Sequence, residues 1–294
     1  MEIIDGKKIS NQIKEEIKLE VQNIISNGET APHLAAVLVG KDGASLTYVG
    51  SKVRSCEQVG FKSTLIKLPE TITEKELLFN IEKLNNNDQI DGFIVQLPLP
   101  KHINENKILL AINPDKDVDG FHPTNFGKMA LNMKTFIPAT PYGIIELLKR
   151  YKINTQGKHT VVIGRSHIVG RPISILMNSK GEVGDSTVTV AHSRTKNIES
   201  YIKKADIVIS ALGIPGFVKK NMIKKGVVII DVGITRVIDS NSPRGYVIKG
   251  DVDFESVKDK VSYITPVPGG VGPMTIAMLL KNTLLSKSLL KLDH

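Results

Sequence analysis

The chain has 294 residues, 41% of them hydrophobic and 23% charged, which is enough to bury the core of one large domain or two ordinary ones. Its single cysteine excludes an internal disulfide, no apolar run approaches the roughly 18 residues of a membrane helix, and the N-terminus lacks a signal peptide's apolar core, so we expect a cytoplasmic protein without membrane contact. The formal charge of +9 is not gathered into a dense basic segment with interleaved aromatics, which argues against nucleic acid as a partner.

Short apolar runs alternate with helical stretches, the pattern of parallel sheets with crossover helices. The first half of the chain predicts a helix between Ser45, as its N-cap, and Gly60, as its stop. Thr73 and Glu76 form a capping box that opens the next helix, which extends through about Leu84. Buried strands are expected at residues 34–39, 61–68 and 91–96, with a short helix near residues 104–112.

A second α/β series occupies the other half of the chain. Thr140 and Pro141 are expected as the N-cap and first residue of a helix that ends near Tyr151. Residues 178–186 are expected to form an exposed turn, and the last helix is expected from about Gly272 to Lys287. The strands of this half are expected at residues 160–163, 187–191, 207–210, 227–231 and 262–265. Two α/β domains, divided between about residues 121 and 140, account for this pattern most simply.

Tyr48 and Lys52 are the first candidate for chemistry. Four residues apart on a helix, their Cβ atoms lie roughly 6 Å apart on one face, so a phenol and an amine could hold a flat ring and move a proton. A packed tyrosine beside a surface lysine is the more common explanation of this spacing. Short-chain dehydrogenases also use Tyr-x-x-x-Lys, but their glycine loop precedes the pair, whereas here Gly164 follows it.

A second candidate is the turn at Gly164. Residues 161–172 have the pattern of a strand, a tight glycine turn and a helix start, which lays a pyrophosphate on backbone N–H groups. Gly164 allows the sharp turn and Gly170 allows the helix to approach the strand. Ser166 replaces the middle glycine of Gly-x-Gly-x-x-Gly, so an ordinary structural turn remains an alternative.

The residues after the next expected strand bear on the choice of dinucleotide. An acid there would bind the ribose 2′-hydroxyl of NAD, but Ser193 and Arg194 follow and no acid does. A hydroxyl and a cation suit a 2′-phosphate, and Arg165 could reach the same group. The sequence therefore favours NADP over NAD, with an ordinary polar turn as the alternative.

Taken together, these motifs resemble, in order along the chain, one family: the bifunctional methylenetetrahydrofolate dehydrogenase/methenyltetrahydrofolate cyclohydrolases of the FolD type. Ala139 stands where that family often has cysteine, a departure that does not touch the expected chemistry. The resemblance covers nearly the whole chain. It rests on residues 39–45 with Tyr48 and Lys52, Val95-Gln96-Leu97-Pro98-Leu99-Pro100, Asp117-Val118-Asp119-Gly120, residues 164–172, Asp231-Val232-Gly233-Ile234 and residues 266–275.

The resemblance implies a two-domain α/β fold. Its parts are an N-terminal catalytic, folate-binding domain with a mostly parallel sheet (residues 1–121), a Rossmann-like NADP-binding domain (residues 122–272), and a C-terminal helix (residues 273–294) that returns to the first domain. It also implies a homodimer without a metal. The partners would be tetrahydrofolate derivatives, and the positive net charge is compatible with an anionic polyglutamate tail.

The activity implied by the resemblance has two steps, in the one-carbon metabolism that serves purine biosynthesis. NADP⁺ oxidises 5,10-methylenetetrahydrofolate to the methenyl form, which water then converts to 10-formyltetrahydrofolate in a cleft between the domains. Lys52 would be the acid–base, Tyr48 would stack on the folate, Gln96 would support Lys52, and Asp119 would bind the pterin.

Further binding residues follow from the same resemblance. The substrate site would add Leu97, Pro268, Gly269 and Gly270. The cofactor site would comprise Gly164, Arg165, Ser166, Val169, Gly170, Ser193, Arg194 and Ile234.

Three other functions stay open at the level of sequence. The first is a monofunctional NAD(P)-dependent methylenetetrahydrofolate dehydrogenase, since one lysine can serve one step or both. The second is a non-catalytic nucleotide-binding regulator, against which Lys52, Gln96 and Asp119 argue. The third is a basic nucleic-acid-binding protein, which has no motif in its support.

Overall fold

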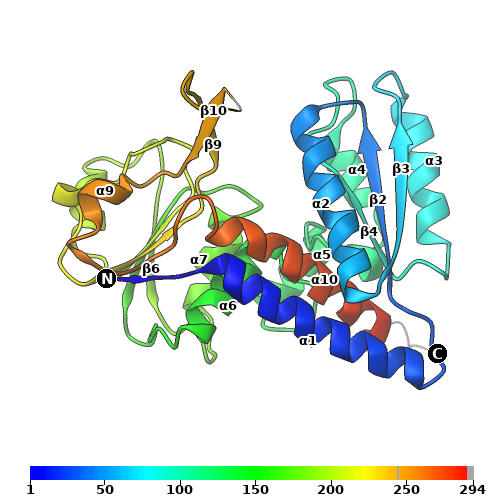
Figure 1. Cartoon of the computed structure of the whole chain (residues 1–294), viewed down its shortest axis with the longest axis horizontal. Coiled ribbons are helices and arrows are strands. Elements are labelled where there is room, and N and C mark those ends of the chain that lie inside the picture. The colour runs from blue at the N-terminus through cyan, green and yellow to red at the C-terminus, as the bar shows by residue number, and fades with distance from the viewer. Residues whose placement is uncertain (244, 290–294) are drawn as a thin grey trace. The chain divides into compact units, whose positions relative to one another are not determined.

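The computed structural model describes residues 1–243 and 245–289. The chain divides into two compact units: Met1–Ser10 with Thr140–Thr275, and Asn11–Ala139 with Ile276–His294 (Figure 1). These units differ from the expected domain bounds, because the chain passes from one to the other at residues 139 and 140 and the first ten residues join the C-terminal unit. The last five residues of the expected helix 273–294 lie outside the described part of the chain.

The unit of residues 11–139 is built on a three-stranded parallel sheet with strand order β3-β2-β4. The middle strand is apolar along its length and almost fully buried, as expected where helices cover both faces of a parallel sheet. The predicted strands are confirmed within a residue at each end. They are β2 (His33–Val39), β3 (Lys62–Leu68) and β4 (Gly92–Val95), and the crossover helices are α2 (Gly43–Val59) and α3 (Glu74–Asn85).

The ends of the crossover helices follow from their capping residues. The prediction of Ser45 as the N-cap of α2 is wrong, because the carboxylate of Asp42 caps the helix by accepting from the Ser45 backbone N–H at 2.8 Å. Gly60 ends α2 as predicted, with a positive φ of 83°. The capping box of α3 is confirmed: Thr73 accepts from the Glu76 N–H at 3.2 Å, and the Glu76 carboxylate accepts from the Thr73 N–H at 2.9 Å.

Four further helices and one 3-10 turn belong wholly or largely to this unit. The long helix α1 was not predicted, although Ile13, Ile17 and Val21 recur at helical spacing and are buried along one face. The elements are α1 (Gly6–Ser26), α4 (Glu105–Ala111), the 3-10 turn η1 (Pro114–Lys116), α5 (Pro123–Ala130) and α10 (Val271–Leu289).

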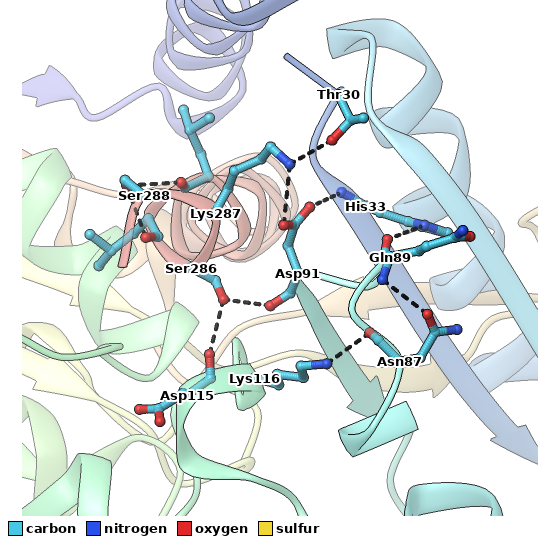
Figure 2. Close-up of polar contacts among 12 residues, drawn as sticks. Thr30, His33, Asn87, Gln89, Asp91, Asp115, Lys116, Ser286, Lys287 and Ser288 are labelled. Carbon is cyan, nitrogen blue, oxygen red and sulfur yellow. Dashed lines mark hydrogen bonds and ion pairs between the residues drawn. The ribbon is translucent and has the colours of Figure 1, made fainter. Parts of the chain in front are cut away.

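Polar side chains dock the C-terminal helix α10 onto this unit. The Asn282 amide donates to the backbone oxygens of Val118 and Ile137, at 2.8 and 2.9 Å. Figure 2 shows Lys287 reaching Thr30 and the Asp91 carboxylate, with N···O distances of 2.9 and 3.4 Å. The expected return of this helix to the N-terminal part of the fold is confirmed over residues 276–289.

The variant Asp91→Ala tests how much the docking of α10 contributes to the stability of the fold. The Asp91 carboxylate also accepts from the His33 backbone N–H at 2.7 Å, and the side chains of Asp91 and Lys287 are only 9% and 12% exposed. We expect Asp91→Ala to lower the free energy of unfolding by about 2–4 kcal/mol in urea titrations, because it leaves the buried Lys287 ammonium without its counter-charge and the His33 N–H without its acceptor. Glu255→Ala, which breaks the exposed pair with Lys258, is the control and should cost no more than about 0.5 kcal/mol. Equal costs for the two variants would contradict this role of Asp91.

The other unit contains a six-stranded parallel sheet with order β1-β11-β8-β7-β5-β6. From β6 onward this is the doubly wound order 2-1-3-4-5, a Rossmann-like arrangement whose topological switch point lies between β5 and β7. The five strands predicted in this half of the chain are confirmed. The strands are β1 (Glu2–Ile3), β5 (His159–Ile163), β6 (Thr187–Ala191), β7 (Ile207–Ser210), β8 (Val227–Asp231) and β11 (Val261–Ile264).

The remaining elements of this unit were predicted only in part. A separate antiparallel pair, β9 (Thr235–Ile238) and β10 (Tyr246–Lys249), was not foreseen. The prediction of Thr140 as an N-cap is wrong: it lies in the first turn of its helix, and its hydroxyl pairs with that of Thr275 at 3.1 Å. The helices are α6 (Ala139–Arg150), α7 (Gly170–Asn178), α8 (Ile198–Ile202) and α9 (Phe254–Val257), with a 3-10 turn η2 (Lys220–Met222).

Candidate active site

Lys52, Tyr48 and Gln96 are brought together in the unit of residues 11–139. Lys52 and Tyr48 lie on α2, which follows β2, and Gln96 follows the neighbouring strand β4, at the carboxyl end of the sheet where α/β folds bind ligands. The Lys52 Nζ donates to the Gln96 Oε1 at 3.2 Å and lies 4.7 Å from the centre of the Tyr48 ring. Tyr48 and Lys52, predicted as a pair, therefore do lie together, and Gln96, a third predicted site residue, lies beside them.

The amide of Gln96 is held in one orientation. Its Nε2 donates to the Leu97 backbone oxygen at 2.6 Å, which leaves Oε1 to accept from Lys52. Its own backbone N–H donates to the Val37 oxygen at 2.9 Å and so continues the β2–β4 ladder by one residue. The Leu97 oxygen thus fixes the Gln96 amide, and the amide in turn holds the Lys52 amine, at the point where β4 ends.

Burial sets the proton affinity of this group. Lys52 is only 5% exposed, and desolvation lowers the pKa of its ammonium, while the Asp119 carboxylate opposes that change. Desolvation likewise raises the pKa of Asp119, and the charge of Lys52 opposes it. The hydrogen-bond acceptor of Lys52 is a neutral amide, which adds no full negative charge to stabilise the ammonium. Burial beside a neutral acceptor therefore makes this amine easier to deprotonate than a surface lysine, as an acid–base group requires.

The turn that carries Asp119 is fixed by Asp117, whose individual role the sequence did not reveal. The Asp117 carboxylate is 2% exposed and accepts from the His122 N–H at 2.8 Å and the Asn125 Nδ2 at 2.9 Å. The Gly120 N–H donates to the Asp117 backbone oxygen at 3.0 Å, with φ at 72°. Asp119 is therefore presented by a turn that is tied down on both sides.

Asp117→Asn tests this buried carboxylate. Burial raises the pKa of Asp117 from 3.8 to about 7, although its hydrogen bonds from Asn125 and His122 oppose the change. Between these values the folded chain binds more protons than the unfolded one, so the stability contributed by this group is full below about pH 4 and lost as the pH rises through 7. In urea titrations, the free energy of unfolding of the wild type should fall relative to that of Asp117→Asn between about pH 5 and pH 8. A pH-independent difference would count against this assignment.

In the other unit, the predicted glycine turn has the close approach that the motif requires. A β-carbon on Gly170 would collide with the Gly164 backbone oxygen, and one on Gly164, where φ is 124°, would collide with the Ala211 oxygen. The Ser166 hydroxyl accepts from the N–H groups of Val169 and Gly170, each at 3.2 Å. The tight strand–turn–helix geometry is thus present, and Ser166 caps the first turn of α7.

The loop after β6 carries the residues predicted to choose the dinucleotide. Ser193 and Arg194 are exposed, and the loop is closed by the His192 N–H, which donates to the Thr195 Oγ1 at 2.9 Å. Arg165 is exposed in the turn after β5, the strand paired with β6. These side chains are available for an anionic group at the carboxyl edge of the sheet.

Ile234 and the loop of residues 266–273 lie after β8 and β11. The Ile234 side chain is 62% exposed. The glycines of the second loop have a packing role: the Gly269 oxygen accepts from the Lys7 N–H at 2.9 Å, and the Gly270 N–H donates to the Pro266 oxygen at 2.8 Å. A β-carbon at Gly6 would collide with the Gly270 oxygen. The backbone of this loop thus packs against the start of the chain, a contact that the sequence did not reveal, and its role as a ligand-facing loop stays a prediction.

Among residues 1–243 and 245–289, no group of three or more His, Cys, Asp or Glu side chains gathers as metal ligands would. Within the same residues, no helix combines the length and apolarity needed to cross a bilayer.

Comparison with known proteins decides the family. Residues 4–119 match the catalytic domain of the tetrahydrofolate dehydrogenase/cyclohydrolase family, and residues 138–290 match its NAD(P)-binding domain. The chain belongs to this family. It is 70% identical over 289 residues, 98% of each chain, to the bifunctional protein FolD of Flavobacterium johnsoniae.

Solved structures agree with this assignment. The FolD enzyme of Campylobacter jejuni is 48% identical, with a TM-score of 0.92 over 98% of this chain and 99% of its own. The dehydrogenase-cyclohydrolase of Trypanosoma brucei, solved with an NADP cofactor and an inhibitor, is 37% identical, with a TM-score of 0.91 over 98% of both chains. The resemblance stated from the motifs is confirmed, and the chain is a bifunctional dehydrogenase and cyclohydrolase of folate one-carbon metabolism.

Proposed function

We propose that Lys52 is the acid–base of the cyclohydrolase reaction, with Gln96 orienting its amine and Tyr48 stacking on the folate ring. The observation that carries this proposal is the buried Lys52 Nζ, which donates to a neutral amide oxygen while its pKa is lowered. An ordinary surface lysine stays charged at pH 7 and is a poor base. A lysine with a lowered pKa can accept a proton and return it, as general acid–base catalysis requires.

Only the second of the two reactions moves protons at this amine. In the first, the methylene carbon of 5,10-methylenetetrahydrofolate loses a hydride and becomes the methenyl cation; NADP⁺, when bound, supplies the hydride acceptor. In the second, water adds to that carbon, the bond from the carbon to N5 breaks, and both protons of the water leave its oxygen: one ends on N5 and the other is released to solvent, which leaves a formyl group on N10. Lys52 would take the proton from water and return one to N5. The cationic methenyl substrate would lower its pKa further.

Asp119 and Leu97 complete the proposed substrate site. The Asp119 carboxylate can accept hydrogen bonds from the 2-amino group and the N3–H of a pterin, a two-point match. The hydrogen bonds of Asp117 fix the turn that carries Asp119. The loop of Pro268, Gly269 and Gly270 remains part of this proposal as a further wall for the folate.

Lys52→Met tests the acid–base role. We expect cyclohydrolase activity to fall by at least about 100-fold, the low end of the usual contribution of general acid–base catalysis, while circular dichroism and the thermal midpoint show a folded protein. The measurement is the decay of the methenyltetrahydrofolate chromophore. Undiminished hydrolysis would contradict the role.

Lys83→Met is the matched control for that experiment. Lys83 lies 4.3 Å from the centre of the Phe79 ring on α3, with the same four-residue spacing and the same stacking as Lys52 on Tyr48, but it is exposed. This variant should retain full activity. An equal loss in both variants would show that lysine–aromatic stacking, and not the buried amine, is what matters.

We infer that the cofactor is NADP rather than NAD. The residues present fit this dinucleotide: a glycine turn with no space for a β-carbon would let the pyrophosphate approach, and a loop with Ser193 and Arg194 but no acid follows β6. The related Trypanosoma brucei enzyme, solved with NADP, supports the inference. Arg165, Ser193 and Arg194 would hold the 2′-phosphate, with Gly164, Ser166, Val169, Gly170 and Ile234 lining the rest of the dinucleotide.

Steady-state assays with either dinucleotide test this choice. When methylenetetrahydrofolate is mixed with NADP⁺ or NAD⁺, the appearance and decay of the methenyl chromophore report both activities at once. We expect kcat/KM to be at least about tenfold higher with NADP⁺, and Arg165→Ala to reduce the NADP⁺ value selectively by a similar factor. Lys180→Ala, which removes an exposed cation from the turn of residues 178–186, should change neither value. Equal or better turnover with NAD⁺ would refute the inference.

The homodimer, the cytoplasmic location and the binding of polyglutamylated folates remain predictions. The chromophore assay also separates the bifunctional enzyme from a monofunctional dehydrogenase, in which the methenyl signal would accumulate without enzymatic decay.

A further inference from the structure

Two buried carboxylates that the proposed chemistry does not use stand together in the Rossmann-like unit. Asp231, the last residue of β8, is 3% exposed, and Asp251, just after β10, is fully buried. The Asp231 Oδ1 accepts from the Asp251 backbone N–H at 2.9 Å. Burying two acids side by side is costly unless they are well hydrogen-bonded, so their partners indicate what they do.

Asp251 holds the loop that follows β7. Its carboxylate accepts from the N–H groups of Leu212 and Ile214, at 2.6 and 2.9 Å, and from the Ser210 hydroxyl at 3.2 Å. The same loop lies against the glycine turn, because the Ala211 oxygen occupies the space that a β-carbon on Gly164 would need. Asp251 therefore fixes one wall of the crevice at the β5/β7 switch point.

Asp231 holds the loop that follows its own strand. Its carboxylate accepts from the N–H groups of Gly233 and Val252, each at 2.9 Å, and so sets the turn that leads to Ile234. The two loops are also joined directly, since the Thr235 hydroxyl donates to the Gly213 oxygen at 3.3 Å. Asp231 and Asp251 thus hold two adjoining loops in place at the carboxyl edge of the sheet.

Neighbouring glycines make room for these carboxylates. A β-carbon on Gly233 would collide with the Asp251 Oδ1, and one on Gly250 would collide with the Asp231 Oδ2. The Asp-Val-Gly and Gly-Asp sequences are therefore parts of one packed arrangement. Burial raises the pKa of Asp231 to about 6, so at neutral pH its carboxylate is mostly ionised and depends on its N–H donors.

We propose that Asp231 and Asp251 are positioning residues for the dinucleotide: they hold the loops after β7 and β8 in the conformation that accepts it. This inference rests on the proposed dehydrogenase function. In a doubly wound sheet the cofactor lies outside the carboxyl ends of the strands at the switch point, which is where these loops are held. The pair acts through Leu212, Ile214 and Gly233, and does not itself touch the cofactor.

The cyclohydrolase reaction needs no dinucleotide, and this separates positioning from general stability. We expect Asp251→Asn to raise the Kd for NADP⁺, measured by calorimetry, by at least about tenfold, because an amide oxygen cannot serve all three donors. The ratio of dehydrogenase to cyclohydrolase activity should fall by a similar factor. Glu255→Gln, the same carboxylate-to-amide change at an exposed position on α9, is the control and should alter neither quantity.

Ser210→Ala is the milder variant, since it removes only one donor to Asp251 and keeps the carboxylate. It should raise the Kd for NADP⁺ about threefold with little change in cyclohydrolase rate. An unchanged Kd in both variants, or an equal loss of both activities, would overturn the proposal. A wild-type protein that hydrolyses methenyltetrahydrofolate but binds no dinucleotide would instead overturn the proposed dehydrogenase function.

Discussion

The chemistry proposed for this protein depends on one buried contact, the donation of the Lys52 ammonium to the neutral amide of Gln96. Had a carboxylate taken the place of the amide, its charge would stabilise the ammonium and raise the pKa again. The amide instead orients the Lys52 ammonium without adding a charge, and the orientation of the amide is set by the Leu97 oxygen at the end of β4. The parallel order of β2 and β4 brings the helix and the strand end together. Thus the reactivity of one amine follows from strand order and burial.

A second device recurs in both units: a buried carboxylate that accepts backbone N–H groups and so fixes a neighbouring loop or turn. Asp117 does this for the turn of Asp119, and Asp231 and Asp251 do it for the loops after β8 and β7. Backbone donors carry no full positive charge, so desolvation dominates and the pKa values of Asp117 and Asp231 are raised. A buried carboxylate with backbone N–H donors can therefore hold a loop without a buried lysine or arginine as its partner.

The sequence predicted the parts of this fold whose signal is local. Strands such as β2, β7 and β8 are buried on both faces, so they stand out as short, continuous apolar runs. Tyr48 and Lys52 could be paired because helical spacing is regular. Errors arose where neighbouring residues competed for one role: Asp42 caps α2 rather than Ser45, because the helix begins at Gly43 and the N–H that its cap accepts from is that of Ser45 itself.

Features that depend on distant partners could not be predicted. The first strand, Glu2–Ile3, is too short to recognise alone and exists because it pairs with β11. The glycines at 269 and 270 contact residues 6 and 7, a pairing of distant segments that no local pattern reveals. Asp251 had no motif of its own and gains its meaning only from donors that lie about 40 positions earlier in the chain.

Ser166 stands where the glycine turn usually has its middle glycine, and its hydroxyl changes which groups can bind a phosphate. In a Gly-x-Gly-x-x-Gly turn, the first N–H groups of the helix are free for a phosphate, but here the Ser166 hydroxyl accepts from the N–H groups of Val169 and Gly170. With these donors partly satisfied, a bound anion must rely more on side-chain cations. Arg165 and Arg194 are exposed in the adjoining loops and can supply that charge. A modified turn with flanking arginines is thus a coherent way to bind a dinucleotide that carries an additional phosphate.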